Sequence, residues 1–168
     1  APLDDIRFVL EEMLGVEQFA DIPAYAETAD HDLIRQVLEE GAKLSQETLF
    51  PLNITGDAEG CHFNDGEVTT PKGFKQAYEI FIEGGWPALA MDPAYGGMGM
   101  PQVVNFVMQE ILSSANMAFG MYPGLSQGAY DAIYKHGSDA QKNLYLPKLA
   151  DGTWSGTMNL TEPQCGTD

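Results

Sequence analysis

Apolar side chains recur at three- and four-residue steps along most of the chain, and this spacing predicts amphipathic helices. One such segment covers residues 3–15, and a second covers residues 30–50. Asp30 is expected to cap the second helix, and Pro51 is expected to stop it. Residues 53–69 contain three glycines and several turn formers, so a long loop is predicted there.

A third helix is predicted to begin with Thr70 as its cap and Pro71 at its first position, and to close at Gly84-Gly85. Residues 86–101 are irregular and rich in glycine and methionine, and they continue no helical pattern. The methionines are interpreted mainly as core filler rather than as a ligand surface. They are Met91, Met98, Met100, Met117 and Met121.

Three helices are predicted after this irregular stretch. The first carries an apolar side from Val104 to Leu112 and is expected to break at residues 117–122. The second is expected to end at Gly137. A capping box formed by Ser138 and Gln141 opens a short last helix that is expected to end before Pro147.

Every second position is apolar over residues 153–160, which is the period of a half-buried strand. Trp154, Gly156, Met158 and Leu160 fall on one face, and Thr153, Ser155, Thr157 and Asn159 fall on the other. A strand needs a neighbour for its backbone donors and acceptors, and little else in the chain alternates in this way. The predicted architecture is therefore mainly α, with six helices and one terminal strand at which the chain enters a sheet.

The formal net charge of −17 narrows the range of partners, because so acidic a surface repels phosphate backbones and anionic membranes. No apolar run reaches the roughly 18 residues that a membrane helix needs, and the start of the sequence lacks the features of a secretory signal. Cys61 and Cys165 are the two cysteines, and their spacing is not that of a metal site. A reducing interior, and specifically the cytoplasm, is the expected location.

The residues alone assemble no catalytic constellation. The three histidines lie in different segments, and Cys61-His62 cannot complete a zinc site. Asp92–Pro101 is rich in glycine but lacks the ending of a phosphate-binding loop, so a structural loop is favoured. Hydroxyls and backbone amides cluster around residues 161–167, where they would suit a carbonyl-rich ring or a phosphate. On the pattern alone, however, an ordinary turn between strands is the favoured interpretation.

Four segments in order resemble the acyl-CoA dehydrogenase family. Met158–Asp168 is similar to the family's flavin-contacting signature, Thr-Glu-Pro followed by two variable residues and Gly-Ser-Asp. Asp92–Gly99 resembles its Pro-Glu-Glu-Tyr-Gly-Gly loop, Glu110 stands where the family has an acidic pair, and residues 136–152 resemble the segment that precedes the signature. The loop that begins at Gly56 looks like that of a longer bacterial branch, which includes 3-methylmercaptopropionyl-CoA dehydrogenase and FadE-like enzymes.

The resemblance implies that residues 1–152 form the N-terminal helical domain of the acyl-CoA dehydrogenase fold and that residues 153–168 begin its middle β-domain. It implies an FAD-dependent α,β-dehydrogenation of an acyl-CoA, with the catalytic glutamate outside this chain, so that no catalytic residue is expected within it. The implied flavin-binding residues are Met158, Leu160, Thr161, Gly166 and Thr167. The implied acyl-CoA-binding residues are Met121, Gly124, Leu125, Gly128 and again Thr167.

The resemblance also implies electron-transfer flavoprotein as electron acceptor and a homo-oligomeric full-length protein. No nucleic acid, membrane or metal is expected as a partner. Two alternatives remain: a related acyl-CoA oxidase or nitroalkane oxidase would share these residues, and a helical protein-interaction module would need no catalysis. A chain of this kind alone is expected to be inactive, because half of the flavin site would be missing.

Overall fold

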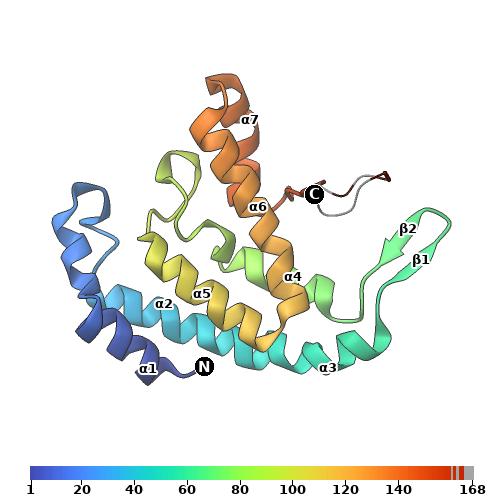
Figure 1. Ribbon diagram of the computed structural model, residues 1–168, viewed down its shortest axis with the longest axis horizontal. Coiled ribbons are helices and arrows are strands. Elements are labelled where there is room, and N and C mark those ends of the chain that lie inside the picture. The colour runs from blue at the N-terminus through green and yellow to red at the C-terminus, as the bar shows by residue number, and fades with distance from the viewer. Residues whose placement is uncertain (160, 162, 165–168) are drawn as a thin grey trace.

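The computed structural model of the protein describes residues 1–159, 161, 163 and 164, and it is mainly helical, as the sequence predicts (Figure 1). The seven α-helices of these residues are α1 (Leu3–Arg7), α2 (His31–Leu44), α3 (Phe50–Glu59), α4 (Phe74–Glu83), α5 (Gln102–Ala115), α6 (Met117–His136) and α7 (Asp139–Ala150). Two short strands, β1 (His62–Asn64) and β2 (Glu67–Thr69), form an antiparallel hairpin. Wider π-helical turns cover Phe8–Met13 and Ser45–Leu49, and 3₁₀ turns cover Val16–Asp21, Pro23–Tyr25, Trp86–Ala88 and Pro93–Tyr95.

One large core lies where α2, α4 and α5 meet the N-terminal helix and the start of α6. Its most enclosed side chains include Leu38, Leu49, Phe81, Val104 and Met108. A smaller cluster joins α6 and α7 to residues 88–91 and is built around Tyr130 and Leu146. In Figure 1, α2 and α3 run in sequence along one side of the molecule, α5 and α6 lie above them, and α7 stands at the far end of α6.

The prediction that Pro51 stops the second helix is wrong. Residues 45–49 widen into a π turn, in which the Phe50 N–H bonds to the carbonyl of Ser45, and Pro51 then sits in the first turn of α3. Proline is tolerated there because a first-turn N–H needs no helical partner. The helical path therefore continues to Glu59.

The prediction of a long loop over residues 53–69 is also wrong, because α3 occupies its first half and the hairpin its second. Asp65 and Gly66 connect the strands with φ values of 46° and 86°. Two positive φ values in a two-residue connection are typical of the type I′ turn, for which Asp-Gly is a preferred sequence. The pairing places Phe63 opposite Val68.

Two helix boundaries differ from prediction for local reasons. α4 begins at Phe74, after Gly73 at φ 88°, so Thr70 is not its cap. The break expected at residues 117–122 is confined to Asn116, whose side chain accepts the N–H of Phe119 at 3.1 Å and donates to the carbonyl of Leu49 at 3.1 Å.

Other boundary predictions are confirmed. The first helical segment ends at Gly15, and Asp30 caps α2 by accepting the N–H of Leu33 at 2.9 Å. Ser138 and Gln141 form the expected capping box. α7, however, does not end before Pro147 but continues to Ala150. Of the five methionines interpreted as core filler, Met91 and Met100 are buried, whereas Met98, Met117 and Met121 are exposed.

The strand predicted over residues 153–160 is not formed in the part of it that the structure describes, residues 153–159. Within the described residues, the only strands are those of the hairpin, so no strand lies beside this segment to pair with it. Its backbone bonds to helices instead: Trp154 N–H donates to the carbonyl of Lys148 at 3.0 Å. The division of the chain at residue 152 into two domains stays a prediction.

Candidate functional site

One face of α6 is open and carries all four predicted acyl-binding positions of that helix. Met121, Gly124, Leu125 and Gly128 recur at three- and four-residue steps and therefore share one side of the helix. Met121 is 67% exposed and Leu125 is 41% exposed. Apart from the neighbouring residues and backbone of α6 itself, no described atom lies within 4 Å of where a Cβ would stand on Gly124 or Gly128. Close helix packing, the other explanation for these glycines, is therefore excluded within the described chain.

The segment that leads into the signature is fastened beside this face by three hydroxyl groups. Tyr78 of α4 donates its hydroxyl to the carbonyl of Gly152 at 2.8 Å. Tyr122 of α6 shares a hydrogen bond with the hydroxyl of Ser155. Ser126, one turn farther along α6, accepts the N–H of Gly156 at 3.0 Å. Two helices thus fix the course of residues 152–156.

Gly156 lies against α6 so closely that a side chain would not fit. A Cβ at this position would lie 2.5 Å from the Cβ of Ala129 and 2.9 Å from the carbonyl oxygen of Leu125. The alternating pattern assigned Gly156 to a strand face, but this contact requires a glycine for another reason, the close approach of two backbones. The segment therefore passes directly over the helix that carries the open face.

The surroundings of Tyr78 keep its hydroxyl protonated. Burial raises the pKa of Tyr78, and the neighbouring Tyr122 and Asp151 raise it further. The two tyrosine rings meet edge to face, with their centroids 5.3 Å apart. Asp151 itself accepts both the N–H of Thr153 at 2.8 Å and its hydroxyl at 2.6 Å, which closes a turn between α7 and the anchored segment.

The predicted flavin-binding residues lie just beyond the anchor or outside the described chain. Met158 is 65% exposed, and Thr161 is exposed as well. Leu160, Gly166 and Thr167 lie outside the described residues, as does Glu162 of the same signature. The structure thus brings Ser155 and Gly156, which precede the signature, against α6, and the flavin-binding roles stay a prediction.

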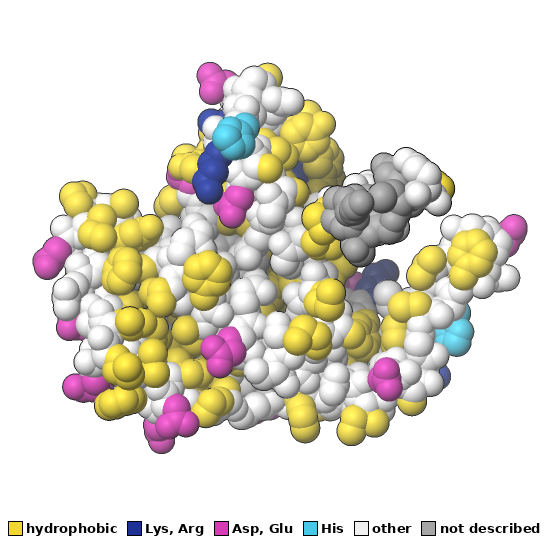
Figure 2. All heavy atoms as spheres, in the orientation of Figure 1, with side chains coloured by type: hydrophobic (Ala, Val, Ile, Leu, Met, Phe, Trp, Pro, Cys, Tyr) yellow, Lys and Arg dark blue, Asp and Glu magenta, His cyan; other side chains and the backbone are white. Residues whose placement is uncertain are grey.

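A broad apolar groove lies next to the anchor and was not predicted from the sequence. It has a volume of about 1160 Å³ and runs between α3, the hairpin and the first turns of α4 and α6, with Tyr78 and Tyr122 in its wall. Figure 2 shows hydrophobic side chains exposed on the projecting hairpin and on the adjoining part of the body. One feature of the sequence could have indicated the hairpin that borders this groove. The Asp65-Gly66 dipeptide is typical of a hairpin turn, although a long loop was predicted there.

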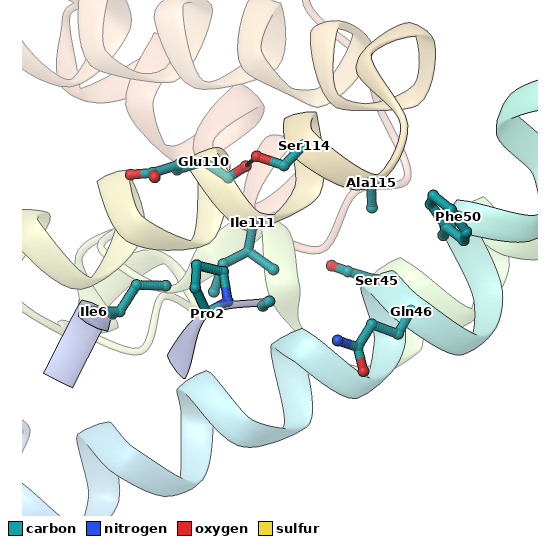
Figure 3. Close-up of a pocket in the computed structure, with 10 residues that line it drawn as sticks. Pro2, Ile6, Ser45, Gln46, Phe50, Glu110, Ile111, Ser114 and Ala115 are labelled. Carbon is teal, nitrogen blue, oxygen red and sulfur yellow. Dashed lines mark hydrogen bonds between the residues drawn. The ribbon is translucent and has the colours of Figure 1, made fainter. Parts of the chain in front are cut away.

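A second, smaller cavity of about 330 Å³ lies away from this groove, between α5, the N-terminal residues and the π turn at Ser45 (Figure 3). Ser45 is 1% exposed, and its hydroxyl has no hydrogen-bond partner among the described residues. Glu110, the predicted acidic position, lines this cavity with an exposed side chain, and it is not one of the residues that flank the anchored segment.

The glycine-rich segment Asp92–Gly99 folds back on its own backbone. Gly99 N–H donates to the carbonyl of Met91 at 2.9 Å, and a Cβ on Gly97 would lie 2.0 Å from that same oxygen. Asp92 accepts the hydroxyl of Tyr134 at 2.7 Å, which lowers the pKa of Asp92 and raises the pKa of Tyr134 to about 12. These contacts agree with a structural loop that ties residues 86–101 to α6.

Two negative findings apply to the part of the chain that the structure describes. No group of three or more His, Cys, Asp or Glu residues is placed to hold a metal ion. None of the helices there is long and apolar enough to span a bilayer.

Comparisons with known proteins agree with this geometry. Residues 28–153 match the family model described as the N-terminal domain of acyl-CoA dehydrogenase. The chain is 45% identical over its full length to 3-methylmercaptopropionyl-CoA dehydrogenase of Ruegeria pomeroyi and covers 28% of that protein. It is 34% identical over 98% of its length to a butyryl-CoA dehydrogenase of Syntrophomonas wolfei and covers 27% of it. The chain thus spans little more than a quarter of the length of these relatives.

A solved structure has the same fold. Butyryl-CoA dehydrogenase from Megasphaera elsdenii superposes on 83% of this chain with a TM-score of 0.67, at 22% sequence identity and over 34% of its own length. Sequence and fold agree, and the chain belongs to the acyl-CoA dehydrogenase family, whose N-terminal helical domain it carries.

Proposed function

We propose that this chain is the N-terminal part of a flavin-dependent acyl-CoA dehydrogenase, within which it forms one wall of the reaction site. The observation that carries the proposal is the course of residues 152–156, which lead toward the signature and lie against α6 beside its open face. The relatives named 3-methylmercaptopropionyl-CoA and butyryl-CoA dehydrogenase support this reaction class. The 45% identity favours the longer bacterial branch.

The α6 face would border the acyl chain of the substrate. Gly124 and Gly128 would leave room for this chain, the acyl trough, and Met121 and Leu125 would flank it with exposed apolar side chains. Apolar walls would favour the hydrocarbon part of an acyl-CoA over its phosphates. Thr167, outside the described residues, would approach the CoA moiety.

The segment beyond Gly156 fits a flavin ring in the chemistry of its donors. Met158 and Thr161 are exposed, so the backbone of the first and the hydroxyl of the second are available to a ligand. By family resemblance, Thr161 would bond near the flavin N5, and the backbones of Met158 and Leu160 would face the ring. Gly166 and Thr167 would reach the cofactor's phosphates. When bound, FAD would supply the acceptor for the substrate's β-hydride.

The proton-abstracting glutamate would come from residues beyond this chain. Glu110 is exposed at the rim of the smaller cavity, and Glu162 belongs to the signature, so neither is assigned as the base. The role of the present residues is to orient the flavin and to bind the acyl chain.

The test uses the natural protein that contains this sequence. Purified with FAD and given butyryl-CoA or 3-methylmercaptopropionyl-CoA without oxygen, it should lose its flavin absorbance near the visible maximum as the flavin is reduced. An unchanged spectrum with a series of acyl-CoA substrates would overturn the proposal. The 168-residue polypeptide made alone should carry no stoichiometric flavin, and finding it yellow after purification would contradict the view that half of the site is missing.

The electron acceptor separates the proposal from an acyl-CoA oxidase or a nitroalkane oxidase. Rapid reoxidation of the reduced protein by oxygen, with release of hydrogen peroxide, would favour an oxidase. Reoxidation by electron-transfer flavoprotein would favour the dehydrogenase and is the expected result. The resemblance to the acyl-CoA dehydrogenase family is what motivates that acceptor as a candidate. We also expect the whole protein to be a homo-oligomer.

A further inference from the structure

The three hydroxyl contacts to residues 152–156 have a consequence for the flavin. We propose that Tyr78, Tyr122 and Ser126 act as positioning residues, and that together they fix the angle at which the signature segment leaves the helical domain. This inference rests on the proposed function, because it gives the contacts a role in flavin binding. The three residues are named the hydroxyl bracket below.

The bracket holds a short stretch at three successive places. Tyr78 binds the carbonyl of Gly152, Tyr122 binds the side chain of Ser155, and Ser126 binds the N–H of Gly156. Four residues then separate Gly156 from Thr161, whose hydroxyl is the predicted flavin contact. A change in the direction of the chain at the bracket would therefore shift Thr161 relative to the flavin ring.

The bracket supplies hydrogen-bond partners for two backbone groups of this stretch, the carbonyl of Gly152 and the N–H of Gly156. The contacts come from two helices, one from α4 and two from successive turns of α6. Gly156 adds a steric limit, because it rests against Ala129 and the backbone of Leu125. Leu125 is itself part of the open face, so the same turn of α6 borders both the acyl trough and the anchored segment.

The bracket holds neutral groups, two of the backbone and one side-chain hydroxyl, rather than a charged ligand. Its members are hydroxyls, and burial raises the pKa of Tyr78, so that it stays a donor throughout the neutral range. Each hydrogen bond contributes about 1 kcal/mol net, which corresponds to about fivefold in an equilibrium constant. Loss of one contact should therefore weaken flavin binding measurably without unfolding the domain.

The experiment uses the FAD-bound natural protein and three variants of the hydrogen bond between Tyr122 and Ser155. Two variants remove one hydroxyl each, and the third removes both. Tyr122→Phe deletes the hydroxyl but keeps the ring that packs on Tyr78. Ser155→Ala deletes the other partner of the same bond, and the double variant deletes both. We expect each single variant to raise the dissociation constant of FAD about fivefold and to shift the visible flavin spectrum. The double variant should be no worse than either single one, because both remove the same contact.

Tyr145→Phe is the matched control. Its ring lies 5.9 Å from the ring of Trp154 in the same segment, but its hydroxyl makes no hydrogen bond to residues 152–156 in the described structure. Flavin affinity and spectrum should stay at the wild-type values in this variant.

The readouts separate a positioning role from a merely structural one. If Tyr122→Phe lowers the melting temperature while FAD affinity and spectrum stay unchanged, the bracket only stabilises the fold and the inference is overturned. Additive losses in the double variant would also overturn it, since the two hydroxyls would then act through different contacts. If the wild-type protein itself binds no flavin, the proposed function fails, and the bracket's role falls with it. Wild-type flavin binding with unaffected variants overturns the bracket alone.

Discussion

Ser45 shows how a single buried atom can reduce stability. Its hydroxyl is enclosed within the π turn, beside the smaller cavity, and lacks a partner among the described residues. A buried hydroxyl without a hydrogen bond costs about 1–3 kcal/mol, and alanine also has the higher helix propensity.

Ser45→Ala should therefore stabilise the protein, by about 1 kcal/mol in the free energy of unfolding. For a domain of this size, that corresponds to a rise of about 2–4 °C in melting temperature. Ser126→Ala is the comparison, because Ser126 is also buried but accepts the N–H of Gly156. Differential scanning calorimetry should give opposite signs for the two variants, and equal losses would show that Ser45 has a partner.

Glu11 is a second residue whose surroundings lead to a measurable effect. Its carboxylate accepts the Nε of Arg35 at 2.7 Å and the Nη2 at 2.5 Å, and His31 approaches it to 3.2 Å. The hydrogen bond from Arg35, followed by that from His31, lowers the pKa of Glu11 to about 2. This pair connects the N-terminal helix to α2.

A carboxylate whose pKa is lowered in the folded state stabilises that state fully above its unfolded pKa and loses the effect as the pH falls through the folded value. The contribution of Glu11 should therefore be complete above about pH 5 and should disappear between about pH 4.5 and pH 2. Glu11→Gln should lower the melting temperature by about 2–4 °C at pH 7. This difference should shrink in acid. Glu12→Gln, on an exposed neighbour for which the described structure gives no ion pair, is the control and should leave the melting temperature at pH 7 near the wild-type value.

At the scale of elements, helical periodicity predicted the existence of the helices better than their ends. The apolar stripes on α2, α4 and α5 are buried as expected, because burial on one face is what the pattern records. The sequence predicts that helices stop at Pro51 and before Pro147, yet both prolines lie inside helical paths. The π turn before Pro51 and the contact between Asn116 and Leu49 depend on distant parts of the chain, so local sequence could not reveal them.

The candidate site also has one part that the sequence predicted and one part that it could not predict. The positions on the α6 face follow from spacing and resemblance, and the structure places them together on an open surface. The bracket could not be predicted, because Tyr78 and Gly152 are 74 positions apart and no periodicity connects them. The prediction of a terminal strand was wrong for a related reason. Apolar and polar residues do alternate in this segment, but a strand also needs a neighbouring strand, which the described chain does not contain.

The open face of α6 leads to a prediction in which stability and function oppose each other. Gly124→Ala and Gly128→Ala each add a methyl group where no atom lies within 4 Å. Each should stabilise the helix by about 0.5–1 kcal/mol, because glycine inside a helix costs that much relative to alanine. The same methyl groups would narrow the proposed acyl trough.

Steady-state kinetics of the natural protein with a series of straight-chain acyl-CoA substrates should show this trade-off. We expect kcat/KM to fall more for the longer chains than for the shorter ones, while the melting temperature rises. Gly156→Ala is the contrasting change, since its methyl group would meet Ala129 and the carbonyl of Leu125. It should destabilise by about 1–3 kcal/mol. An equal loss for all chain lengths in the α6 variants would place the acyl chain elsewhere.

At the scale of the whole molecule, two surface properties oppose each other. The hairpin projects from the body and exposes Phe63 and Val68, which lie opposite each other on neighbouring strands (Figure 1). The outer edges of its strands are unpaired within the described chain, and such edges favour association. The net charge of −17 acts against association, because two copies repel each other at long range.

The range of that repulsion decides which property dominates. The Debye length falls from about 30 Å at 0.01 M salt to about 3 Å at 1 M, whereas apolar contact is not screened. The 168-residue polypeptide should therefore be monomeric in dilute salt and should associate increasingly in sodium chloride up to 1 M. Sedimentation velocity across this range measures the effect.

Replacing Phe63 and Val68 together by serine should keep the polypeptide monomeric at high salt. Met13→Ser, at an equally exposed apolar position far from the hairpin, should leave the association unchanged. A polypeptide that stays monomeric at every salt concentration would mean that the hairpin offers too little apolar surface to hold two copies together.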